Sequence, residues 1–192
     1  MNIPNKLSML RIILIPFMLF FYLADFVPYG KIIAIAIFIV AAFTDMLDGH
    51  IARKYNLVTN LGKLLDPIAD KLLVMSALLL VVVDYTIPHP YGVIVAIIII
   101  GRELLISAFR QIAASKNFVM AADKLGKIKT ITQDIALPLL FLISFLTNNV
   151  SINSNVLFVI QIIGYILIGL ATLLTIISGA NYLIKNKEVL KD

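Results

Sequence analysis

Residues 45–70 read DMLDGHIARKYNLVTNLGKLLDPIAD, and no other part of the chain constrains its structure so tightly. The stretch places four carboxylates, Asp45, Asp48, Asp66 and Asp70, between two long apolar runs that are typical of membrane helices. An acid inside a membrane segment costs about 2.5–3.5 kcal/mol on insertion scales, so such residues mark functional sites. The stretch therefore predicts two membrane helices that carry a functional acidic cluster.

The composition is also that of a membrane protein. Of 192 residues, 61% are hydrophobic and only 14% are charged, whereas soluble domains carry about 25% charged residues. The mean hydropathy is +1.02. The absence of cysteine excludes a disulfide framework and a Cys-based zinc site. The net charge is +5, but the basic residues cluster beside apolar runs, which does not indicate nucleic-acid binding.

Six apolar segments can be drawn, and each is long enough to cross a hydrocarbon core of about 30 Å. They lie near residues 9–28, 31–52, 65–84, 91–113, 127–147 and 155–183. The fold class predicted is an all-α integral membrane protein with six transmembrane helices in a single domain over residues 1–192. Residues 1–8 are expected to form a short interfacial helix ahead of the first span.

The basic residues set the expected orientation. In the six-span drawing, all but one of the Lys and Arg residues considered lie on one side of the membrane: Lys6, Arg11, Arg53, Lys54, Lys63, Lys116, Lys124, Lys127, Lys129, Lys185, Lys187 and Lys191. Only Lys31 lies clearly on the other side. Cytoplasmic loops carry an excess of Lys and Arg, so both termini and the acidic cluster are expected to face the cytoplasm.

The acids form two pairs. Asp45 and Asp48 are three apart, and Asp66 and Asp70 are four apart, so each pair shares one helix face. The loop 54–62 can bring the two pairs face to face. Four close carboxylates repel one another unless they are protonated or bridged by metal. Two Mg²⁺ or Mn²⁺ ions suit this oxygen-only set, and paired metals are common in phosphoryl chemistry.

Small and basic residues accompany the acids. Gly49 and Ala52 leave room for a ligand to approach the backbone, and Gly62 can serve the same purpose or end the loop. Arg53 offers a fork of donors that suits phosphate oxygens. The structural alternative is that the small residues are helix-packing positions and that Arg53 is an interfacial anchor.

The complete pattern, Asp45-x2-Asp48-Gly49-x2-Ala52-Arg53-x8-Gly62-x3-Asp66-x3-Asp70, resembles the motif of the CDP-alcohol phosphotransferase family at every fixed position. Within that family the chain is most similar to the bacterial branch that makes phosphatidylglycerophosphate. This closer likeness rests on residues 1–5, Gly101-Arg102-Glu103 and Gly126-Lys127-x-Lys129-Thr130. The resemblance implies transfer of the phosphatidyl group from CDP-diacylglycerol to glycerol 3-phosphate, in a bacterial cell membrane. It also implies a homodimer.

The resemblance assigns roles residue by residue. Asp45, Asp48, Asp66 and Asp70 would hold two divalent cations, and Asp70, at their edge, would also act as the base. Residues expected to contact CDP-diacylglycerol are Asn5, Ser8, Gly49, Ala52, Arg53, Thr59 and Gly62. Ser8 stands where threonine is commoner in relatives, which keeps the hydroxyl.

The phosphate of the acceptor needs a second basic pocket. Arg102 and Arg110 are eight apart, about two helical turns, and so lie on roughly one face. Arg110, Lys127 and Lys129 are the predicted phosphate cradle, with Arg102 in support. Arg102 lies deep in an apolar segment and therefore needs a polar or charged partner. Its neighbour Glu103 is expected to point elsewhere. A positive-inside loop is the alternative explanation of the lysines.

Two further functions fit parts of the pattern. A family member with another acceptor, such as inositol phosphate, serine or phosphatidylglycerol, would keep the acids but has less need of the basic pocket when its acceptor carries no free phosphate. A cation transporter would also bury acids. A transporter is expected to show inverted repeats or broken helices, and the sequence shows neither.

Overall fold

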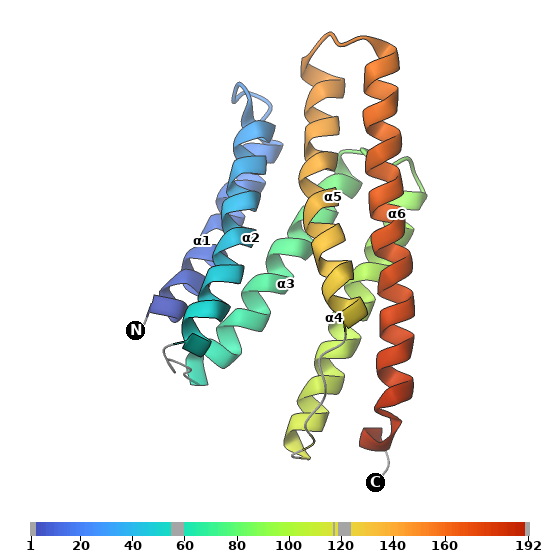
Figure 1. Cartoon of the computed structure of the whole chain (residues 1–192). Coiled ribbons are helices and arrows are strands. Elements are labelled where there is room, and N and C mark those ends of the chain that lie inside the picture. Colours follow the sequence, from blue (N-terminus) through green and yellow to red (C-terminus); the bar gives the residue numbers. More distant parts are fainter. Residues whose placement is uncertain (1–2, 55–59, 117, 119–123, 191–192) are drawn as a thin grey trace.

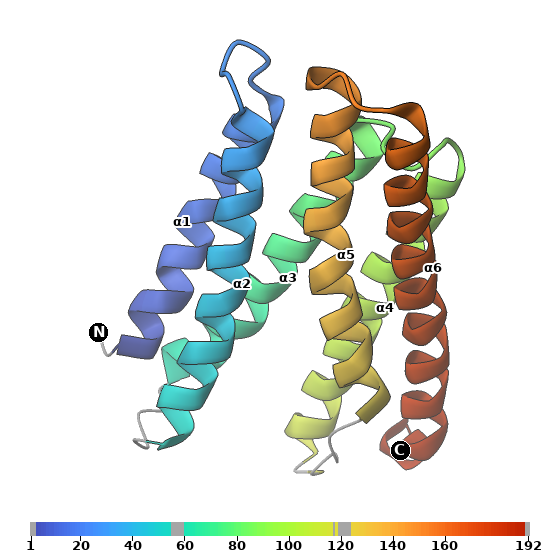
Figure 2. The same cartoon turned by 45° about the horizontal axis from the view of Figure 1, so that its top comes forward.

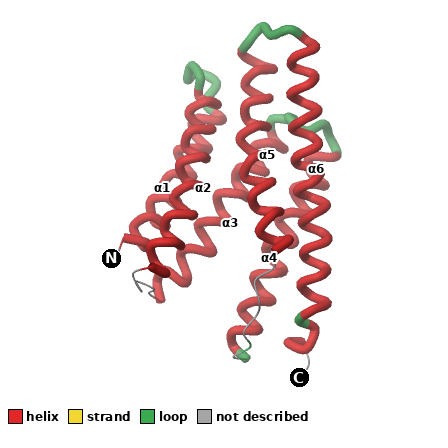
Figure 3. Tube along the Cα trace, viewed as in Figure 1, coloured by secondary structure: helices red, strands yellow, loops and turns green. Residues whose placement is uncertain are grey.

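The computed structural model describes residues 3–54, 60–116, 118 and 124–190, and at residues 45–54, at Asp66 and at a few helix ends it describes the backbone alone. Within these residues the chain forms six α-helices and one 3-10 turn, without β-strands (Figure 3). The elements are α1 (Ile3–Leu23), α2 (Gly30–Lys54), α3 (Asn60–Val83), α4 (Tyr91–Ser115), α5 (Lys124–Asn149), α6 (Ser154–Lys185) and η1 (Lys187–Leu190).

Helix α1 differs from the sequence prediction. It runs without interruption from Ile3 to Leu23, so residues 3–8 are its first turns and not a separate interfacial helix. No glycine or proline stands between Asn5 and Ile15 to break the helix. Pro16 lies inside α1, which continues through it. The expectation of a short separate helix was therefore wrong for the described residues.

Among the described residues, four helices are long and apolar enough to cross a membrane: α1 over Asn5–Leu23, α4, α5 and α6. The first part of α2, Gly30–Thr44, is a shorter apolar helix. The chain is thus built as a multi-pass membrane protein. Hydrocarbon offers no hydrogen-bond partners to backbone N–H and C=O groups. Apolar segments of this length fold as helices because a helix pairs these groups within itself.

Helix α3 lies at the centre of the molecule. It contacts α1, α2, α4 and α5, and it crosses obliquely between the α1–α2 pair and the remaining helices (Figures 1 and 2). The main core forms along it, where Leu73, Ala77 and Val81 meet Met18 of α1 and Phe141 of α5. A smaller core joins α4, α6 and η1. The oblique path of α3 separates its first turns from the lower half of α4.

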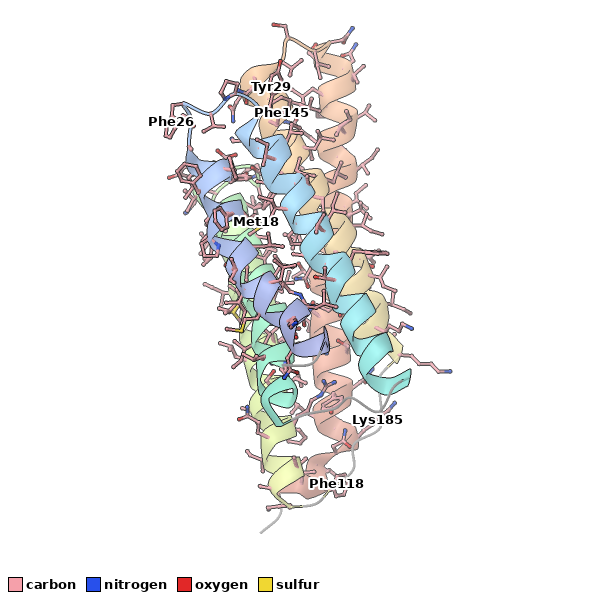
Figure 4. The ribbon with its side chains drawn as sticks, turned by 90° about the vertical axis from the view of Figure 1, so that its left-hand side faces the viewer. Met18, Phe26, Tyr29, Phe118, Phe145 and Lys185 are labelled. Atoms are coloured by element: carbon pink, nitrogen blue, oxygen red, sulfur yellow. The ribbon has the colours of Figure 1, made fainter. Side chains whose placement is uncertain are left out.

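Different loops and helix ends lie at the two ends of the bundle. The loops at residues 24–29, 84–90 and 150–153 form the upper end in Figure 1, and the start of α1 and the end of α6 lie at the lower end. Figure 4 shows Tyr29 beside Phe145 near the upper end, with ring centroids 5.9 Å apart, and Phe118 and Lys185 near the lower end. The basic pocket predicted from sequence belongs to the lower half.

Candidate functional site

A cavity of about 460 Å³ lies between α3 and α4. These two helices diverge toward the lower end (Figures 1 and 2). Three predicted site residues line it: Asp70 from α3, and Arg102 and Arg110 from α4. Lys71 and Glu103 also line the cavity. The structure therefore brings the predicted base on α3 and two of the predicted acceptor-binding residues on α4 to one cavity.

Glu103 binds two cations from two helices. Its Oε1 accepts hydrogen bonds from Arg102 Nη1 at 3.0 Å and from Lys129 Nζ at 2.7 Å. Arg102 Nη2 donates to Ser178 Oγ on α6 at 3.1 Å. The expectation that Glu103 points away from Arg102 was wrong. The two residues leave the helix in different directions, but the long Arg102 side chain returns to the carboxylate that Glu103 extends toward Lys129.

Arg110 is held from α6. Its Nε donates to the Tyr182 hydroxyl at 3.1 Å, and the guanidinium carbon lies 5.4 Å from the centroid of the Tyr182 ring. This packing combines a hydrogen bond with a cation–π contact and limits the rotamers of a long side chain. Arg110 remains exposed while lining the cavity. Its guanidinium is thus oriented but accessible.

The two lysines of the predicted cradle lie in different surroundings. Lys129 is 3% exposed and lines a small chamber of about 20 Å³ next to the cavity, together with Asp70, Glu103 and Gln133. Lys127 is exposed and lines neither space. Residues two apart on a helix point to different faces, which explains the separation. The structure groups Lys129, but not Lys127, with Arg102.

Sequence analysis assigned no site role to three further residues. Lys71 follows the motif directly and lines both spaces. Gln133 is 1% exposed and follows Lys129 by one turn of α5. Arg11, which was counted only as a basic anchor, is fully buried in α1. The spacing of Ser8 and Arg11, three apart on one helix face, was the available signal for the last of these.

The cavity surroundings carry an excess of positive charge. Four cations, Lys71, Arg102, Arg110 and Lys129, face two carboxylates, Asp70 and Glu103, which leaves two positive charges in excess. A phosphate monoester carries a charge of about −1.5 to −2 at neutral pH. The charge of the site therefore matches a phosphorylated small molecule and disfavours a purely cationic ligand.

The residues predicted for the CDP-lipid are only partly described. Asn5 and Ser8 are buried, at 4% and 0% exposure, near the start of α1, and Gly62 is buried in the first turn of α3. Gly62 thus lies inside a helix and does not end the loop. Thr59 lies outside the described residues, and only the backbone is described at Gly49, Ala52 and Arg53.

The predicted metal ligands are also only partly described. The side chains of Asp45, Asp48 and Asp66 lie outside the described residues, and the described side chains form no cluster of three or more metal-ligating residues. The described backbone puts Asp45 and Asp48 in the last turns of α2 and Asp66 and Asp70 in the first turns of α3. These two helix ends lie at the same end of the molecule, and α2 contacts α3 (Figure 1).

Known proteins of similar sequence identify the family of this chain. The family profile of CDP-alcohol phosphatidyltransferases matches residues 1–178. A Bacillus subtilis protein named CDP-diacylglycerol–glycerol-3-phosphate 3-phosphatidyltransferase is 39% identical over 99% of this chain and 97% of its own length. Proteins of the same name from Rickettsia bellii and Escherichia coli are 37% and 44% identical, over 94% and 71% of this chain and 93% and 74% of their own lengths. The chain therefore belongs to the CDP-alcohol phosphatidyltransferase family.

Proposed function

We propose that this protein transfers the phosphatidyl group of CDP-diacylglycerol to sn-glycerol 3-phosphate, giving phosphatidylglycerophosphate and CMP. The relatives that carry this name cover most of the chain. The observation that carries the proposal is the cavity in which Asp70 faces Arg102 and Arg110. An acceptor with a hydroxyl at one end and a phosphate at the other needs a base and a basic surface in one space.

Arg110 is the proposed anchor of the acceptor phosphate. Its Nε is occupied by Tyr182, whereas its Nη groups have no hydrogen-bond partner among the side chains that the structure describes. A guanidinium fork binds phosphate oxygens in pairs. Lys71 and Lys129 add charge from α3 and α5, and Arg102 supports them through Glu103. Lys127 would act only at longer range, from the surface.

Two divalent cations, Mg²⁺ or Mn²⁺, are the proposed cofactors. Carboxylate oxygens are the ligands these hard ions prefer, and the ends of α2 and α3 that carry Asp45, Asp48, Asp66 and Asp70 lie together, so the donor set fits. When bound, the ions would offset negative charge on the phosphoryl group. Asn5, Ser8, Gly49, Ala52, Arg53, Thr59 and Gly62 are proposed to bind the CDP-lipid.

Asp70 is the proposed base. It is half-buried and lines both the cavity and the chamber, so it faces the space where the acceptor would lie. Asp70 would take the proton of the primary hydroxyl of glycerol 3-phosphate. The oxygen then forms a bond to the phosphatidyl phosphorus in line with the bond to CMP, which breaks as CMP leaves.

The topology proposed is six membrane spans in the bacterial cell membrane, with both termini and the cavity facing the cytoplasm. The basic helix ends gather at the lower end, whereas Lys31 stands alone near the upper end of the described chain. A homodimer is proposed from the resemblance alone.

Release of CMP by the purified protein in detergent tests the activity. CDP-diacylglycerol and Mg²⁺ would be supplied with glycerol 3-phosphate, inositol phosphate, serine or phosphatidylglycerol in turn. Turnover with glycerol 3-phosphate alone, and its loss on chelation, is expected. Turnover with a different acceptor would refute the basic pocket as a glycerol-phosphate site, and no CMP with any acceptor would refute the enzyme.

A further inference from the structure

Gln133 is a buried polar side chain without a hydrogen-bond partner among the described residues. It lies in α5 with 1% of its surface exposed, and both its Nε2 and its Oε1 lack a hydrogen bond to any residue that the structure describes. Leaving both ends of a buried amide unpaired is costly, and such groups are rare in folded proteins. An apolar residue of similar size would fill the same position without that penalty. The amide therefore needs a partner that the described part of the chain does not supply.

The amide faces the chamber beside the candidate site. Gln133 and Lys129 line the chamber from α5, and Asp70, Lys71 and Glu103 line it from α3 and α4. The last three residues also line the 460 Å³ cavity, so the two spaces adjoin. The chamber, at about 20 Å³, holds one water-sized group. It can accept a single hydroxyl of a molecule that occupies the cavity.

Two cations beside the chamber are already hydrogen-bonded within the protein, so Gln133 is the polar group that can bind a hydroxyl there. Lys129 Nζ is hydrogen-bonded to Glu103, and Arg102 is shared between Glu103 and Ser178. Cations bind a phosphate better than a neutral amide does. A hydroxyl donates one hydrogen bond and accepts others, and a side-chain amide offers both a donor and an acceptor. The chemistry of Gln133 therefore matches a hydroxyl and not an anion.

We propose that Gln133 binds the secondary hydroxyl of the acceptor and so selects glycerol 3-phosphate. This inference rests on the proposed function. In glycerol 3-phosphate the secondary hydroxyl stands on the carbon between the reacting primary alcohol and the carbon that bears the phosphate. With the primary hydroxyl at Asp70 and the phosphate near Arg110, the secondary hydroxyl enters the chamber. An acceptor without it leaves the amide unpaired, and such sites reject analogues that lack the hydroxyl.

Acceptor preference tests the proposal. The wild-type protein and Gln133→Met would be compared with glycerol 3-phosphate and with 3-hydroxypropyl phosphate, which differs only by the missing secondary hydroxyl. Methionine has a similar length and suits a helix in an apolar core. Gln133→Met should lower kcat/KM for glycerol 3-phosphate about tenfold and leave kcat/KM for 3-hydroxypropyl phosphate unchanged.

Two further variants make the result decisive. Gln161→Met, on α6 near the upper end, is the matched control and should change neither value. Gln133→Asn keeps the amide but shortens it by one methylene, and it should lose part of the preference. An equal fall with both acceptors, or an unchanged preference in both Gln133 variants, would overturn the proposal. The failure of the proposed function is a different result: the wild-type protein would then release no CMP with glycerol 3-phosphate.

Discussion

At the scale of single residues, the site depends on carboxylates that organise cations. Glu103 Oε1 joins Arg102 and Lys129 across two helices, and Ser178 fixes the other end of the Arg102 fork. Hydrogen bonds between charged groups are stronger than neutral ones and hold long side chains in one geometry. The basic wall of the cavity is therefore preorganised before an acceptor enters.

Replacing Asp70 by Asn separates chemistry from binding. Asparagine has nearly the same shape but cannot take a proton at neutral pH, so Asp70→Asn should lower kcat by at least about 100-fold. Binding of CDP-diacylglycerol should largely survive, because the other predicted ligands remain. CMP release and equilibrium binding of CDP-lipid measure the two effects. Undiminished turnover would exclude Asp70 as the base.

Arg110→Ala should affect one substrate only. Loss of a charged hydrogen bond to phosphate corresponds to about a ten- to hundredfold rise in KM for glycerol 3-phosphate, with KM for CDP-diacylglycerol unchanged. Tyr182→Phe is the matched variant, since it removes the hydroxyl that holds Arg110 Nε and keeps the ring beneath the guanidinium. Its effect on the same KM should be smaller. Equal rises in KM for both substrates would contradict the pocket.

The residue pattern predicted part of this site. Asp70, Arg102 and Arg110 were identified because acids and arginines are rare in apolar helices, and they do meet in one cavity. Glu103 was expected to point away from Arg102, and Gln133 was not among the predicted site residues. Their significance comes from α5, whose approach to α4 is a long-range contact that helical periodicity does not encode.

At the scale of helices, close packing of α5 and α6 depends on a glycine. A Cβ placed on Gly164 would lie 2.5 Å from Ile143 Cδ1 and 3.5 Å from Leu140 Cδ2. The same atom on Gly169 would meet nothing within 4 Å. Small residues let membrane helices approach each other closely. The sequence alone does not tell which of these two glycines faces a neighbouring helix.

Leucine at these two positions should therefore behave differently. Gly164→Leu overpacks the α5–α6 contact and should cost about 1–3 kcal/mol of stability. Gly169→Leu, on the same helix, should cost little. Thermal unfolding in detergent, followed by loss of helical signal, measures both. A fall in Tm of equal size for the two variants would contradict the packing of α6 against α5.

Element boundaries show what local sequence can predict. The centres of the six apolar segments match the six helices, but α3 begins at Asn60 rather than near 65, and α1 includes residues 3–8. Hydropathy detects where a helix is apolar and not where it ends. Polar first turns, such as those of α3, therefore fall outside a segment drawn from hydropathy.

At the scale of the whole molecule, the lower half carries the candidate site and the upper end carries a group of stabilising polar contacts. The lower half holds the cavity, whereas near the upper end Asp84 joins several helices. Its carboxylate accepts from Lys31 Nζ at 2.9 and 3.0 Å and from Tyr22 OH at 3.1 Å, and it also bonds Ser144. These partners come from α1, α2 and α5. Periodicity predicts which face of each helix is buried but not the oblique path of α3 that puts Asp84 among them (Figure 1).

Asp84→Ala should destabilise the protein without changing its chemistry. It leaves the partly buried Lys31, with 13% of its side chain exposed, without a carboxylate partner, and should cost about 2 kcal/mol, or about 5 °C in Tm. KM for glycerol 3-phosphate should not change. Asp25→Ala, an exposed acid at the same end, is the control and should leave Tm unchanged. A changed KM would contradict the separation of the two ends.

The transfer of glycerol 3-phosphate into lipid tests the central claim most directly. Purified protein would receive CDP-diacylglycerol, Mg²⁺ and glycerol 3-phosphate labelled with ³²P, and label in the organic phase would be compared with CMP in the aqueous phase. The account predicts one labelled phosphatidylglycerophosphate for each CMP released. CMP release without label in the lipid would contradict glycerol 3-phosphate as the acceptor.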